Sequence, residues 1–116
     1  MSSATPAEEF AETELIEIPV LDPIVHAQPR LRVLVALSAL GNDDQITFPR
    51  LQELLSMTPG NLSTHLRKLE EAKYVLITKT YRMRTPVTFV ALTQGGRRAF
   101  EDYTSALRRL LELGND

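Results

Sequence analysis

The sequence contains no cysteine and only two histidines among its 116 residues. The absence of cysteine excludes disulfides, thiolate metal sites and thiol chemistry. A zinc site would have to combine His26 and His65 with carboxylates, and no acidic residue is spaced for that role. We therefore expect neither a bound metal nor a cofactor.

Long hydrophobic runs are also absent. No stretch approaches the roughly 18 apolar residues that span a membrane, and the first ten residues, MSSATPAEEF, lack the basic start and apolar core of a signal peptide. With 43% apolar residues, the chain is suited to one small domain with a single hydrophobic core. We expect a cytoplasmic protein.

Motifs that support catalysis are missing as well. The pair Gly95-Gly96 lacks the Lys-Ser/Thr pattern of a phosphate-binding loop. Ser63 and His65 stand two residues apart, so on a helix they point away from each other and do not form a nucleophile and its base. We predict that the protein is not an enzyme.

Charge is distributed unevenly, although the net charge is only −2. Residues 1–22 carry six acidic and no basic residues, which gives −6, whereas residues 23–116 carry all 13 Lys and Arg and have a net charge of +4. The small total therefore does not argue against a nucleic-acid partner. We predict an acidic, flexible tail over residues 1–20 and a folded domain over residues 21–112.

Hydrophobic spacing and turn residues predict a mainly α fold (α+β) in the folded part. The order is helix, short strand, helix, helix, strand, strand, helix. Asp22-Pro23 begins a short helical turn, and Thr93 begins a long last helix. The predicted helices cover about 29–40, 49–56, 60–72 and 94–112, and the predicted strands cover 46–48, 75–80 and 87–92, with a hairpin tip over 81–86.

The helix over 60–72 has one apolar and one polar face. Leu62, Leu66 and Leu69 share the apolar face. Arg and Asn can read base edges, while Ser, Thr and Lys suit phosphates or bases. This face favours DNA binding, although it is also what an ordinary solvated helix shows. Its candidate DNA-contacting residues are Asn61, Ser63, Thr64, Arg67 and Lys68.

The following hairpin is rich in cations. Lys79, Arg82 and Arg84 are expected to crowd its tip, with Arg82 and Arg84 on one side by strand alternation. A basic tip suits phosphates or an A·T-rich minor groove. The alternative is that these charges only protect a sheet edge from aggregation.

With these residues assigned, the chain resembles the winged helix-turn-helix transcriptional regulators of the MarR and ArsR type, and is most similar to the compact winged-helix DNA-binding domain family of bacteria and archaea. The resemblance covers about residues 21–112 and is carried by NLSTHLRKLEEAKYV and by Leu92, Thr93, Gly96, Arg97 and Phe100. It implies a three-helix core, a wing of two to three strands and a long C-terminal helix.

The resemblance also implies a partner and a mode of assembly. Such regulators bind double-stranded DNA sequence-specifically, usually as homodimers on (pseudo)palindromic sites through their first and last helices. Asn61, Ser63, Thr64, Arg67 and Lys68 then match the groove-facing set, and Arg82 and Arg84 match the wing contacts. One position departs from the family pattern, since Lys73 replaces the usual Gly after LEEA.

The leading hypothesis is therefore a homodimeric repressor, because a small domain acts most simply by occupying promoter DNA. The apolar stripe of the last helix can form the dimer surface or can cover the monomer's own core. The alternative function is a protein-interaction module without specific DNA binding. The sequence neither excludes nor identifies a small-molecule effector, and it does not indicate the operator sequence.

Overall fold

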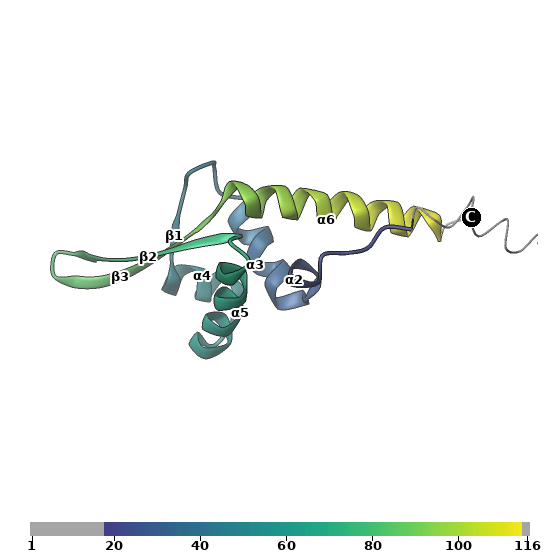
Figure 1. The fold of residues 1–116 in the computed structure, drawn as a ribbon. Helices are drawn as coiled ribbons and strands as arrows, with labels where there is room; N and C mark the ends of the chain where they lie inside the picture. The colour runs from purple at the N-terminus through teal and green to yellow at the C-terminus, as the bar shows by residue number, and fades with distance from the viewer. Residues whose placement is uncertain (1–17, 115–116) are drawn as a thin grey trace, which may run out of the picture.

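The computed structural model describes residues 18–114. The elements follow the predicted order (Figure 1). No helix within residues 18–114 is long and apolar enough to cross a membrane. The helices are α2 (Pro23–His26), α3 (Gln28–Ser38), α4 (Phe48–Leu55), α5 (Pro59–Glu71) and α6 (Gln94–Leu113), and the strands are β1 (Ile46–Thr47), β2 (Val75–Arg82) and β3 (Thr85–Leu92).

Side-chain caps fix where four of these helices begin. The Asp22 carboxylate accepts a hydrogen bond from the backbone N–H of Ile24 at 2.8 Å at the start of α2. Threonine hydroxyls cap the other three helices in the same way: Thr47 caps α4, Thr58 caps α5 and Thr93 caps α6. The predicted starts at Asp22 and Thr93 are therefore confirmed.

The core lies where α3, α4 and α5 meet the sheet. Leu34 of α3, Leu51 of α4 and Leu62 of α5 are fully buried, and Val90 of β3 closes the core from the sheet side. Leu62, Leu66 and Leu69 form the buried side of α5, as their spacing predicts, with exposed fractions of 0–2%. Full burial of a leucine stabilises the fold by about 2 kcal/mol.

The sheet is antiparallel with strand order β1-β3-β2. The β2–β3 hairpin pairs without a break from Val75↔Leu92 to Arg82↔Thr85 and projects beyond the helices as a wing (Figure 1). The predicted six-residue tip over 81–86 is wrong. The turn has only two residues, Met83 and Arg84, whose φ angles of 51° and 72° are those of a tight hairpin turn.

The end of α5 has the left-handed turn that Gly usually provides. Lys73 has a φ of 68°, and its N–H donates to the carbonyl of Glu70 while the N–H of Tyr74 donates to the carbonyl of Leu69, both at 2.9 Å. These two bonds form a Schellman motif. Lys73 therefore adopts the strained conformation instead of ending the helix in another way, and the mainly α winged-helix fold is confirmed.

The two predicted domain limits stay predictions. Residues 1–17 of the predicted acidic tail lie outside the described residues. The predicted last helix agrees with α6, which begins at Gln94 and ends at Leu113.

Candidate nucleic-acid interface

The polar face of α5 is open to solvent over its whole length. The leucines buried on the opposite face determine which side of α5 faces solvent, and the Thr58 cap determines where the helix begins. The Thr64 hydroxyl donates to the carbonyl of Gly60 at 3.0 Å, so it is free to accept from a ligand but not to donate. The structure brings the five predicted residues together on this face, all of them exposed: Asn61, Ser63, Thr64, Arg67 and Lys68.

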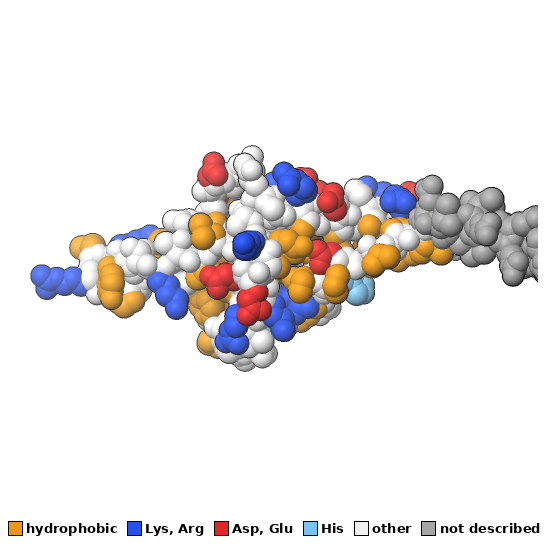
Figure 2. Space-filling view, viewed as in Figure 1, with side chains coloured by type: hydrophobic (Ala, Val, Ile, Leu, Met, Phe, Trp, Pro, Cys, Tyr) orange, Lys and Arg blue, Asp and Glu red, His pale blue; other side chains and the backbone are white. Residues whose placement is uncertain are grey.

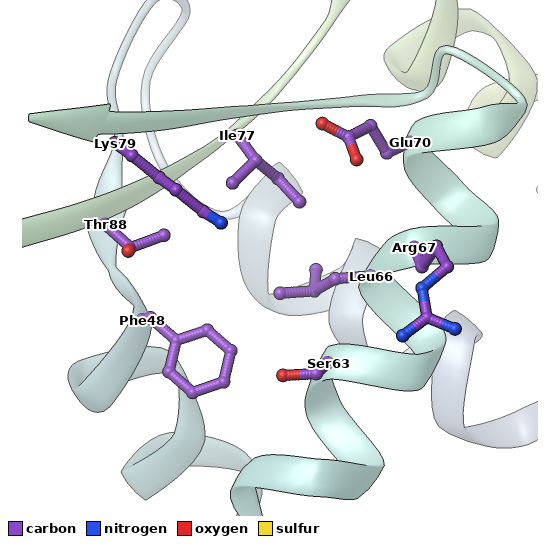
Figure 3. A pocket seen from close by; sticks show the side chains of 8 residues that line it. All are labelled: Phe48, Ser63, Leu66, Arg67, Glu70, Ile77, Lys79 and Thr88. Carbon is purple, nitrogen blue, oxygen red and sulfur yellow. The ribbon is translucent and has the colours of Figure 1, made fainter.

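An open groove of about 750 Å³ separates α5 from the wing (Figure 3). Its apolar floor is formed by Phe48, Leu66 and Ile77. Ser63 and Leu66 point from α5 toward Phe48, and the Lys79 side chain extends from β2 into the same space. The polar residues of its walls are Ser63, Arg67, Glu70, Lys79 and Thr88.

The charges in this groove are not neutralised by one another. Arg67, Lys79 and Glu70 all contribute to its walls, and within residues 18–114 none of them forms an ion pair. By contrast, Arg50 on α4 is held by Glu53 at 2.8 Å. The two groove cations can therefore bind phosphate without first breaking a contact.

Two of the three cations predicted at the tip of the wing, Arg82 and Arg84, lie at or beside the turn, and only Lys79 departs from the predicted cluster. Lys79 pairs with Thr88 in mid-strand and faces the groove, whereas Arg82 lies on the opposite face with its guanidinium 5.4 Å from the centre of the Phe89 ring. Of the three cations, only Arg84 lies in the turn itself.

The remaining residues of the tip are apolar and exposed. Met83 is 93% exposed and Tyr81 is 72% exposed. Neither side chain packs against the hydrophobic core of the described residues. Met83 and Arg84 form the turn that ends the wing, and Tyr81 lies opposite Pro86 just before it.

Five residues that line the groove were not among the predicted DNA contacts: Phe48, Leu66, Glu70, Ile77 and Thr88. Glu70 stands one helical turn after Arg67, so helical spacing alone could have assigned it to the same flank. Phe48 and Thr88 had no such signal. Their position depends on the pairing of β1 and β2 with β3.

His65 lies at the edge between the polar and the buried face of α5, as predicted. Its Nδ1 is buried and has no hydrogen-bond partner within residues 18–114. Burial lowers the pKa of His65 below its usual value, and the nearby cations Arg30 and Lys68 lower it further. With no ligand covering α5, the imidazole of His65 is therefore neutral at neutral pH.

A second surface lies on the other side of the helical body, along α6 and the segment before α2. Hydrophobic side chains gather there on the face shown in Figure 2. Leu111 and Leu113 of α6 are 60% and 55% exposed, and Val20 is 90% exposed. The Tyr103 hydroxyl lies 3.0 Å from Nδ1 of His26 and ties α6 to α2.

Most of the described chain matches a known protein family. Residues 30–111 match the family described as the winged helix DNA-binding domain. An uncharacterized protein of Methanocaldococcus jannaschii is 33% identical over 87 residues, which are 75% of this chain and 91% of the relative.

Solved structures show the same fold. A transcriptional regulator homologue of Pyrococcus horikoshii OT3 is 25% identical with a TM-score of 0.72, over 93% of this chain and 99% of its own. A MarR-family regulator of Rhodococcus sp. RHA1 is 19% identical with a TM-score of 0.62, over 76% and 59%. MepR of S. aureus in complex with DNA is 20% identical with a TM-score of 0.63, over 92% and 77%.

Proposed function

The chain belongs to the winged helix DNA-binding domain family and has the fold of MarR-type transcriptional regulators, and from this premise we propose that it is a homodimeric repressor bound to double-stranded DNA. One observation carries the proposal. The exposed polar face of α5 adjoins a groove whose cations, Arg67 and Lys79, form no ion pair within residues 18–114. Such cations can bind DNA phosphates, and thereby raise the affinity for DNA, without first breaking an ion pair within the protein.

In the proposed complex, α5 enters the major groove. Asn61 and Arg67 read base edges through paired hydrogen bonds, and Ser63, Thr64 and Lys68 contact bases or phosphates. The helix dimensions fit this role, since an α-helix fills the major groove of B-DNA. A solved structure of S. aureus MepR, a protein of the same fold, contains DNA, which supports DNA as the partner in this proposal.

The wing contacts the neighbouring backbone or minor groove in this proposal. Lys79 approaches phosphates from the wall of the α5–wing groove, and Arg84 does so from the turn. Arg82 differs because its guanidinium already lies over the Phe89 ring. We therefore expect Arg82 to stiffen the wing as well as to contact DNA.

The proposed dimer forms through α2 and α6. Support comes from the exposed apolar side chains Val20, Leu111 and Leu113, which border the two helices. A two-fold interface places the same patch against itself, so the apolar surface of both copies is buried together. Buried apolar surface stabilises association by about 25 cal/mol per Å².

Repression is the simplest regulatory outcome for a small domain that occupies promoter DNA. We propose a binding function without catalysis, and expect the protein to act in the cytoplasm. The other candidate, a protein-interaction module, is an outcome of the test described next.

The test of DNA binding is selection from a pool of random duplexes at about physiological salt. We expect enrichment of an inverted repeat with half-sites about one helical turn apart. Retention without any enriched sequence, or no retention, contradicts the proposal and favours the interaction module. Removing residues 1–20 then tests whether the acidic tail competes with DNA.

The test of the dimer is sedimentation of two matched variants. Leu111→Asp introduces a charge into the proposed interface, and Leu76→Asp does the same on the sheet at an equal exposure of 59%. We expect only Leu111→Asp to yield monomers. A dimer that survives this change, or that is lost equally in both variants, contradicts the proposed interface.

A further inference from the structure

The turn that ends α5 is attached to the start of α2 by one carboxylate. The Tyr74 hydroxyl donates to Oδ2 of Asp22 at 2.6 Å. Oδ1 of the same carboxylate accepts from the N–H groups of Ile24 and Val25 at 2.8 and 3.4 Å and caps α2. Asp22 therefore joins the first helix of the proposed dimer surface to the residue between α5 and the wing.

The same turn is also attached to the start of α6. The Thr93 hydroxyl donates to the carbonyl of Lys73 at 2.8 Å and accepts from the N–H of Gly96 at 2.9 Å. The N–H of Thr93 donates to the carbonyl of Tyr74 at 3.1 Å. Residues 73 and 74 are thus held by the capping residues of both helices that border the proposed interface.

The phenol–carboxylate bond is strong enough to transmit a preferred orientation. It is short and charge-assisted, and both residues are half-buried. The Asp22 carboxylate and burial raise the pKa of Tyr74 to about 12, so the hydroxyl stays a donor over the whole neutral range. Ionisation of Tyr74 therefore does not break this bond at neutral pH.

The half-site spacing of a dimer depends on where its two recognition helices lie relative to the two-fold axis. The hydrogen bonds of Asp22 and Thr93 attach the turn at residues 73 and 74 to the starts of α2 and α6. Helix α5 ends and β2 begins on either side of this turn, so both elements leave from the same attached segment.

We propose that Tyr74 and Asp22 are positioning residues that fix the angle between the DNA-reading unit and the dimer surface, and thereby restrict the half-site spacing the protein accepts. The inference rests on the proposed function. Tyr74 and Asp22 then determine which half-site spacing the protein accepts, while the side chains of α5 determine which bases it reads.

The experiment uses the full chain and the selected inverted repeat, synthesised with spacers that are lengthened or shortened by single base pairs. We expect Tyr74→Phe to lower the preference for the best spacing over its neighbours by at least about fivefold. Base preference within one half-site stays unchanged. A merely structural role lowers stability and affects all spacings alike.

Two further variants make the result specific. Asp22→Ser keeps a capping oxygen for α2 but is too short to reach Tyr74, so it should reproduce the effect of Tyr74→Phe. Ser38→Ala removes a hydroxyl that bonds to the carbonyl of Val35 within α3 and leaves the turn, α2 and α6 intact, so it should keep the wild-type spacing profile.

The outcomes separate this inference from the proposed function. A sharp wild-type spacing preference that Tyr74→Phe retains overturns the inference alone. A wild-type protein that selects no sequence, or that binds single half-sites as a monomer, overturns the proposed function and this inference with it.

Discussion

Gly96 packs directly against the backbone of Tyr74, and this contact joins the first turn of α6 to the turn that ends α5. A Cβ at Gly96 would overlap the carbonyl oxygen of Tyr74 and would lie 2.8 Å from its carbonyl carbon. It would also lie 2.9 Å from Cδ1 of Leu92. Since the backbone of Tyr74 is held by hydrogen bonds, it cannot move aside at low cost.

Replacing Gly96 with alanine should therefore destabilise the protein strongly. We expect Gly96→Ala to lower the free energy of unfolding by about 3 kcal/mol, the upper range for overpacking. Urea unfolding followed by circular dichroism measures the change. Gly95→Ala is the matched control, because its Cβ would meet atoms only at 3.7 and 3.8 Å. An equal loss in both variants would show that helix propensity, and not the contact, is responsible.

Lys73 offers a substitution that should stabilise the protein. Its φ of 68° is unfavourable for a residue with a Cβ and favourable for glycine. We expect Lys73→Gly to raise the free energy of unfolding by about 1 kcal/mol. Lys73→Ala removes the same charge but keeps the Cβ, so it should bring no such gain. If the alanine variant gains as much, charge and not backbone strain explains the effect.

His65 should make stability depend on pH. Its pKa is lowered in the folded state, chiefly by burial, whereas an unfolded histidine binds a proton near pH 6.5. As the pH falls below that value, the unfolded chain gains a proton that the folded chain resists, so the free energy of unfolding falls. We expect His65→Gln to reduce this loss between about pH 7 and pH 5. Thermal unfolding across this range measures the change, and an unchanged profile for His65→Gln would refute the prediction.

Arg67 should contribute to base recognition. The side chain is exposed on α5 and borders the groove toward the wing. We expect Arg67→Ala to weaken binding to the selected sequence by about 1–3 kcal/mol and to relax base preference at one position. Arg98→Ala, on the exposed side of α6, is the control for the loss of one positive charge. An equal loss on selected and random duplexes would assign Arg67 to phosphate contact instead.

Arg84 should contribute affinity without sequence preference. It lies in the two-residue turn of the wing, where it can reach phosphates. We expect Arg84→Ala to weaken binding to all duplexes alike and to reduce the salt dependence of the association constant by about one unit. Both residues at the turn have a positive φ, so Met83→Ala is a control of similar backbone geometry that removes no charge. A salt dependence that stays the same in Arg84→Ala would exclude this phosphate contact.

Much of the fold could be predicted from local patterns. The spacing of Leu62, Leu66 and Leu69 defined the buried face of α5, because a 3.6-residue period leaves only one side for the core. Asp22 and Thr93 marked helix starts because their side-chain oxygens satisfy free N–H groups there. The short strand before α4 was found as well, at Ile46 and Thr47.

The wing was predicted less well than the helices. Its strands continue to Arg82 and resume at Thr85, so the tip is shorter than the sequence suggested. The two-residue turn lacks the Asn-Gly or Gly-Gly signal that usually marks it. Met83 and Arg84 adopt positive φ angles because the uninterrupted pairing on both sides leaves no other connection.

The sequence by itself determined the order of the elements and the polar face of α5, because each depends on neighbours within a few residues. Tertiary structure alone decided that Lys79 faces α5 while Arg82 lies over Phe89, since that follows from hairpin register. It likewise decided that Asp22 meets Tyr74, 52 residues away, because packing and not local spacing brings these side chains together.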